Sequence, residues 1–233
     1  MNRRNFLTTL GLGAAGIILP GVSQAKVLQE AIQNPNIKPI SGSWFEFQHP
    51  GGKEGVYWDK DLRNFTATQW REKIREIRET GMEYLVMMNV ASHGFAFYDT
   101  DLAPKFKMGC EDPIETVLSA ADEFGVKFFV SNDYWALDLD AVKMMTDKEL
   151  GRERAKCMEE IYARYHKSFY GWYFPNESWL DPYFGEYVIP YVNECAQIAK
   201  SLNANCVNII APYNIKAEKC DDTFIKQLEQ LNV

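Results

Sequence analysis

The residues best suited to chemistry stand at the end of an aromatic run, Phe169 to Glu177. Aromatic residues favour strands and proline interrupts the hydrogen-bonded ladder, so we expect a strand that stops at Pro175, just before Asn176 and Glu177. In a parallel α/β sheet, the carboxyl ends of the strands form the edge where ligands bind. A carboxylic acid held there against aromatic rings has a raised pKa, as a general acid needs. Glu177 is therefore the candidate catalytic acid, and a solvated loop glutamate is the alternative.

The other predicted strands also end in polar or aromatic residues. Because the carboxyl ends of parallel strands meet at one edge, we expect these residues to surround one ligand pocket. For the tryptophans and tyrosines the alternative is a place in the core or at its rim, and for His93 it is a satisfied loop position. The candidate binding residues are Asn176, Glu46, Asn89, His93, Asn132, Asp133, Tyr134, Trp135, Trp179, Tyr213 and Asn214.

Alternating strand and helix patterns position these residues. The strands begin near residues 43, 83, 126, 170 and 205, about forty residues apart. Amphipathic stretches between them show the spacing of helices. The predicted helices begin at Thr66 or Thr68, at Asp112 before Pro113, and near residues 147, 184 and 221. Apolar strands joined by such crossovers predict a parallel sheet.

Two architectures fit a parallel sheet of this kind: a barrel and an open doubly wound sheet. No Gly-x-Gly-x-x-Gly motif follows the first strand, and no phosphate-binding loop is present. Similar polar residues at every strand end favour a ring of strands around one pocket. The predicted class is therefore α/β, a (β/α)8 TIM-barrel type. The chain holds about five βα units, so we expect a truncated barrel, with a five-unit open sheet as the alternative.

The first residues have the pattern of an export signal. Arg3-Arg4-Asn5-Phe6-Leu7 precedes an apolar run at residues 10–19, and Ser23-Gln24-Ala25 offers a cleavage site. Paired arginines before Phe-Leu indicate the twin-arginine route, with an ordinary secretory signal as the alternative. We expect the twin-arginine translocase as a partner and a periplasmic or extracellular location. The predicted organisation is an export signal at 1–25, a linker at 26–39 and a partial (β/α) barrel domain of catalytic type at 40–233.

Charge and composition limit the possible partners. The formal net charge is −7, and it becomes −9 when the two signal arginines are removed. An acidic chain without a basic stripe disfavours nucleic acid, and disfavours a membrane once the signal is gone. The five cysteines form no zinc motif and read as buried apolar residues. With three scattered histidines, we expect neither a catalytic metal nor a cofactor.

Three segments carry a resemblance to a known family. They are Ser41-Gly42-Ser43-Trp44-Phe45, Gly171-Trp172-Tyr173 followed by Pro175-Asn176-Glu177, and Ala211-Pro212-Tyr213. The layout from Ile40 to Val233 resembles domain-of-unknown-function family 4434, exported bacterial proteins of glycoside hydrolase type. The fourth strand ending is similar to that of the (β/α)8-barrel glycoside hydrolase clan. This resemblance implies that Glu177 is the acid/base and that Asn176 holds a sugar hydroxyl.

Glycoside cleavage requires a second carboxylate. It lies about 5–5.5 Å from the first in retaining enzymes and about 6.5–9.5 Å away in inverting ones. In the barrel clan it comes from strand seven, which this chain is not expected to contain, leaving Glu46 and Asp133 as candidates. The predicted function is hydrolysis of O-glycosidic bonds in a poly- or oligosaccharide. A non-catalytic carbohydrate-binding barrel is the alternative, and a barrel isomerase of phosphosugars or sugar acids is a further one.

Overall fold

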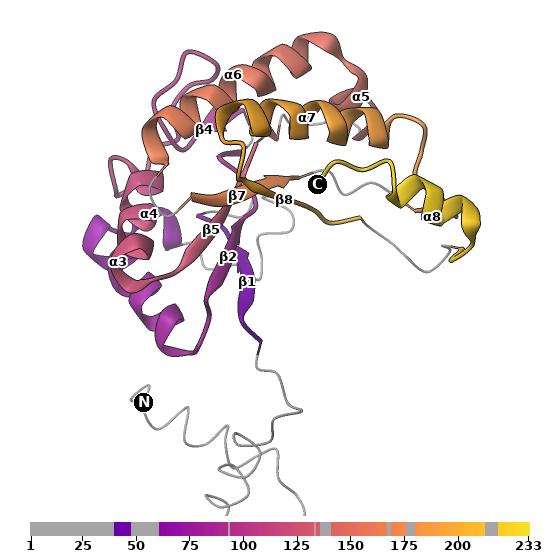
Figure 1. Ribbon diagram of the computed structural model, residues 1–233. Helices are drawn as coiled ribbons and strands as arrows, with labels where there is room; N and C mark the ends of the chain where they lie inside the picture. Colours follow the sequence, from indigo (N-terminus) through magenta and orange to yellow (C-terminus); the bar gives the residue numbers. More distant parts are fainter. Residues whose placement is uncertain are drawn as a thin grey trace, which may run out of the picture. The chain divides into compact units, whose positions relative to one another are not determined.

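Five parallel strands form the main sheet of the computed structural model, which describes residues 40–47, 61–92, 94–132, 134–135, 141–166, 169–175, 180–212 and 219–233. The sheet order is β1-β2-β5-β7-β8, so the chain advances steadily from one edge to the other (Figure 1). The strands are β1 (Gly42–Phe45), β2 (Tyr84–Met87), β5 (Lys127–Ser131), β7 (Phe169–Phe174) and β8 (Val207–Ile210). All five sequence-predicted strands are thereby confirmed, and each begins within two residues of its predicted start.

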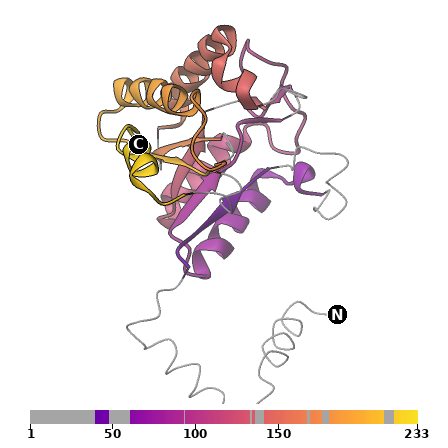
Figure 2. The ribbon, with the colours of Figure 1, turned by 90° about the vertical axis from the view of Figure 1, so that its right-hand side faces the viewer.

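Four long helices connect these strands, and Figures 1 and 2 show them along one side of the sheet. Three begin at the predicted capping residues, because the side chains of Thr66, Asp112 and Asp147 accept hydrogen bonds from the first-turn backbone. Gly125 ends the second helix with a φ of 71°, a conformation that glycine adopts readily. The helices are α3 (Ala67–Glu79), α4 (Pro113–Phe124), α6 (Lys148–Tyr165) and α7 (Val188–Leu202), and a short α8 (Asp222–Leu228) follows β8.

The two faces of the sheet have different surroundings. Side chains alternate between the faces along a strand, and one set packs with α3, α4, α6 and α7 in the hydrophobic core. These core residues include Leu85, Met87, Phe128, Val130, Trp172 and Phe174. The opposite set, here called the aromatic face, contains Trp44, Tyr84, Phe129 and Tyr173. Tyr170 also contacts this face, because the pairing of β5 with β7 shifts register between Phe128 and Phe129.

A second, smaller sheet was missed by the sequence analysis. It contains β3 (Ala91–Ser92), β4 (Phe95–Ala96) and β6 (Tyr134–Trp135) in the order β4-β3-β6. Strands of two residues are too short to leave a periodic pattern, and so are the 3-10 helix η1 (Leu62–Asn64) and helix α5 (Ala141–Thr146). Since β3 follows β2 and β6 follows β5, their parallel pairing holds the segments beyond these two strand ends side by side.

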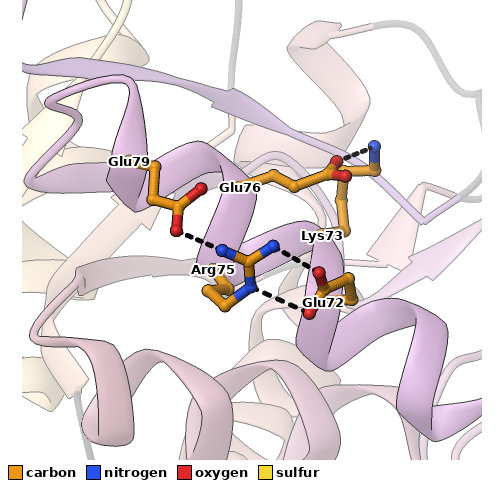
Figure 3. A network of polar contacts seen from close by, with 5 residues as sticks. All are labelled: Glu72, Lys73, Arg75, Glu76 and Glu79. Atoms are coloured by element: carbon orange, nitrogen blue, oxygen red, sulfur yellow. Dashed lines mark hydrogen bonds and ion pairs between the residues drawn. The ribbon is translucent and has the colours of Figure 1, made fainter. Parts of the chain in front are cut away.

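The outer side of α3 carries a network of exposed charges. Arg75 pairs with both Glu72 and Glu79, and Lys73 pairs with Glu76 at 2.8 Å (Figure 3). The guanidinium of Arg75 lowers the pKa of Glu72 through its hydrogen bond. Pairs of this kind at i, i+3 and i, i+4 support a solvated helix face.

The five cysteines form no disulfide, and all of them lie in the described residues. Cys110, Cys157 and Cys195 are buried, as predicted, whereas Cys220 is exposed and Cys206 is partly so. Burial raises the pKa of the Cys206 thiol. Within the described residues, no helix has the length and apolar character needed to cross a bilayer.

Candidate functional site

The predicted site residues follow strands whose carboxyl ends share one edge of the main sheet. Glu46, Asn89 and Asn132 are the three whose side chains the structure describes. For Tyr134 and Trp135 the backbone is described, and it forms β6. The others lie outside the described residues: His93, Asp133, Asn176, Glu177, Trp179, Tyr213 and Asn214.

Asn89 and Asn132 are buried polar residues at neighbouring strand ends. Asn89 is 2% exposed and Asn132 is 0% exposed, and in the described part of the chain neither Oδ1 atom has a hydrogen-bond partner. A buried acceptor without a partner costs about 1–3 kcal/mol. Two acceptors without a hydrogen-bond donor in the described residues therefore lie near the carboxyl ends of adjacent strands.

Asn132 is held from two directions. Its backbone N–H donates to the carbonyl of Tyr173 at 3.2 Å, and its Nδ2 lies 3.6 Å from the sulfur of Met158 on α6. A thioether is a weak acceptor, so this contact fixes the amide orientation more than it stabilises the fold. The nitrogen therefore faces the helix layer. The oxygen is the atom left to accept a hydrogen bond.

Trp44 and Tyr173 form an aromatic pair across the sheet. Their ring centroids lie 5.2 Å apart with the planes inclined by 59°, and Trp44 is 51% exposed. They stand on β1 and β7, three positions apart in the sheet order, which corresponds to about 14 Å in a flat sheet. The pair therefore indicates that the sheet curves toward the aromatic face, as the wall of a barrel does.

Glu46 and Pro175 extend two of these strands at the carboxyl edge. Glu46 follows the half-exposed Trp44 by two residues, is itself partly buried, and lies just beyond the end of β1. Pro175 follows the end of β7 and is buried. The chain is described again at Leu180, which is also buried. Buried residues thus stand on both sides of the segment that contains Asn176 and Glu177.

Sequence reasoning missed several features of this edge. The unpartnered amide oxygens cannot be read from residue types, because they depend on which neighbours the loops supply. Tyr173 is predicted as a strand residue, but its contact with Trp44 depends on the curvature of the sheet. Among the described residues, no three His, Cys, Asp or Glu side chains group closely enough to hold a metal ion.

Residues 40–233 match the family described as Domain of unknown function (DUF4434). No curated protein matches the sequence. Among solved structures, a proposed α-L-fucosidase from Bacteroides thetaiotaomicron VPI-5482 is 17% identical with a TM-score of 0.52, over 74% of this chain and 51% of that chain. A second proposed α-L-fucosidase, from Bacteroides ovatus ATCC 8483, is 15% identical with a TM-score of 0.50, over 82% of this chain and 32% of that one.

These likenesses establish the fold. The predicted α/β fold of TIM-barrel type is confirmed, and it is a glycoside hydrolase-like fold. This chain spans about half of the first structure's chain and about a third of the second's.

Proposed function

The chain belongs to the DUF4434 family, and from that premise we propose that it hydrolyses O-glycosidic bonds of a poly- or oligosaccharide with Glu177 as general acid/base. The observation that carries the proposal is strand β7, a buried aromatic strand that ends at Phe174 on the carboxyl edge of the sheet. Glu177 follows Phe174 by three residues, and three residues of chain reach at most about 11 Å. The proposed acid therefore follows the end of β7 after only a short stretch of chain.

The proposed chemistry assigns one task to each group. The carboxylic acid of Glu177 protonates the leaving oxygen, and the buried aromatic end of β7 supplies an apolar environment that favours the neutral acid. Asn176 holds a sugar hydroxyl near the reacting carbon. Trp44 offers a half-exposed ring on which the apolar C–H face of a sugar can stack. The proposed second carboxylate is Glu46, which follows β1, or Asp133, which follows β5 in the sequence.

A polysaccharide panel tests this proposal, with release of new reducing ends as the readout. We expect Glu177→Gln to lower the rate by about 10²–10⁴-fold, the range for loss of a general acid. The substitution should also remove the fall in rate at high pH that reports ionisation of the general acid. Glu186→Gln is the matched control, because Glu186 is an exposed glutamate of the same connection from β7 to α7 and its loss should leave the rate unchanged.

Two outcomes would contradict the assignment. Equal rates for Glu177→Gln and the parent at every pH would exclude Glu177 as the acid/base. Saturable binding of a glycan without any release of reducing ends would favour the non-catalytic carbohydrate-binding protein instead. Substrates with a good leaving group provide an internal check, because they need less protonation and should lose less rate in Glu177→Gln.

We also propose that the protein is exported through the twin-arginine route to the periplasm or beyond. The support is the Arg3-Arg4 pair before Phe6-Leu7 and the small residues that end at Ala25. An extracytoplasmic location suits a protein that acts on a polysaccharide too large to enter a cell.

A further inference from the structure

A basic hollow is lined by other residues than the strand-end residues described above. Its volume is about 580 Å³, within the range of small-molecule sites. Three cationic residues, Arg63, Lys105 and Lys107, line it together with Phe95 and Phe106. Among the described residues that line it there is no acidic side chain. A local positive site on a chain of net charge −7 favours anions at this place.

Backbone contacts form the hollow before any ligand arrives. The N–H of Gly109 donates to the carbonyl of Arg63 at 2.8 Å, which joins the 105–109 segment to η1. A side chain at Gly109 would collide with the backbone of Asn64, so glycine permits this close approach. Phe106 donates its N–H to the carbonyl of Ala96 at 2.7 Å, which fixes this segment against β4.

The cations of the hollow are not equivalent. Lys105 pairs with Asp99 at 2.9 Å, so part of its charge is already compensated. Arg63 and Lys107 are exposed and form no ion pair within the described residues. A guanidinium and an ammonium free of carboxylates are the groups that bind carboxylate or sulfate oxygens.

The aromatic wall of the hollow is apolar and partly open. Phe95 is 43% exposed, and its ring packs edge-on against Phe106 with centroids 6.2 Å apart. A half-exposed ring beside cations suits a ligand that is apolar on one face and anionic at its edge. A pyranose ring that bears an acidic group has both features.

Topology connects this hollow with the proposed catalytic edge. η1 lies in the connection from β1 to α3, and residues 95–109 lie in the connection from β2 to α4. Connections that leave strands toward helices emerge at the carboxyl ends of parallel strands. The hollow and the segment with Glu177 therefore belong to the same end of the sheet.

We propose that this hollow binds a sugar unit carrying a carboxylate or sulfate group, and hence that the protein acts on an acidic polysaccharide. The claim that the protein acts on this polysaccharide rests on the proposed function, whereas the claim that the hollow binds an acidic sugar does not. Arg63 and Lys107 hold the anionic group, and Phe95 contacts the C–H face of the ring.

Titration calorimetry on the full chain tests the proposal with three probes of similar size. They are trigalacturonic acid, a sulfated carrageenan tetrasaccharide and neutral maltotriose. We expect an acidic probe to bind, with affinity that falls as salt is raised, because salt screens exposed charges. The double variant Arg63→Gln, Lys107→Gln should weaken this binding by about tenfold, the effect of losing roughly 1.4 kcal/mol. The carboxylated and sulfated probes identify which acid is preferred.

The matched control is Arg152→Gln on α6, which removes an exposed arginine outside the hollow. We expect this variant to bind as the parent does. The proposal is overturned if neither acidic probe binds, if maltotriose binds equally well, or if Arg152→Gln weakens binding as much as the double variant. Binding is measured without turnover, so Glu177→Gln can be tested in parallel. Acidic-probe binding with no hydrolysis would refute the catalytic proposal and leave this one standing.

Discussion

At the scale of one residue, the notable feature is the side-chain oxygen of Asn132, a buried hydrogen-bond acceptor. Its side chain is completely buried, and its Oδ1 has no hydrogen-bond partner in the described residues. Stability alone would favour an apolar residue at this position, because burying an unpaired acceptor costs free energy. We therefore propose this oxygen as a candidate acceptor for a hydrogen bond from a ligand.

Replacing this amide by a side chain of similar shape separates stability from function. We expect Asn132→Leu to raise the free energy of unfolding by about 1 kcal/mol, because the unpaired oxygen is removed. The same variant should lose glycan binding or turnover. Urea unfolding and glycan titration measure the two effects. Asn193→Leu is the control, because Asn193 makes two hydrogen bonds to the carboxyl-terminal segment and its loss should destabilise. A fall in stability for Asn132→Leu would show that its oxygen is already paired.

At the scale of elements, β7 depends on a glycine in its middle. The pairing of β5 with β7 shifts register between Phe128 and Phe129, opposite Tyr170, and Gly171 follows directly. A Cβ atom at Gly171 would overlap the carbonyl of Val207 on β8. The close approach of β7 and β8 therefore requires a residue without a side chain.

Two glycine-to-alanine variants give opposite expectations. Gly171→Ala should lower the free energy of unfolding by about 3 kcal/mol, because the backbone of β8 has to move. Gly151→Ala, inside α6, should raise it by about 0.5–1 kcal/mol, since alanine restricts the unfolded chain and its nearest neighbour is the end of the Glu194 side chain at 3.9 Å. Chemical denaturation of both variants checks this. A tolerated alanine at 171 would mean that β7 and β8 are less tightly joined.

The sequence predicts the regular elements well and the connections poorly. Thr66, Asp112, Asp147 and Gly125 mark helix ends through local hydrogen bonds or backbone conformation, so their effect is visible in the sequence. Helix α7 begins at Val188, four residues after the predicted start, because Tyr187 makes no side-chain cap that could mark it. The β3–β6 pairing and the basic hollow join separate connections. Such long-range contacts leave no periodicity in either segment.

At the scale of the whole molecule, the order and curvature of the strands gather the connections at one end of the sheet. The steady order β1-β2-β5-β7-β8 brings every βα connection to the same edge. The contact between Trp44 and Tyr173 indicates that the sheet bends toward its aromatic face. The unpartnered asparagine oxygens belong to connections at this end, and the basic hollow lies between two of these connections. A polysaccharide substrate that contacts all of them is the proposed ligand of this end, and export is proposed alongside it.

The export proposal makes a prediction about the first residues. We expect the variant Arg3→Lys, Arg4→Lys to stay in the cytoplasm, because the twin-arginine pathway reads the arginine pair and lysine lacks the guanidinium fork. The described cysteines form no disulfide, which is compatible with folding before export. Cell fractionation and the mass of the mature amino terminus measure the result, with cleavage expected after Ala25. Arg63→Lys is the control, because it makes the same change far from the signal. Normal export of the double variant would favour the general secretory route.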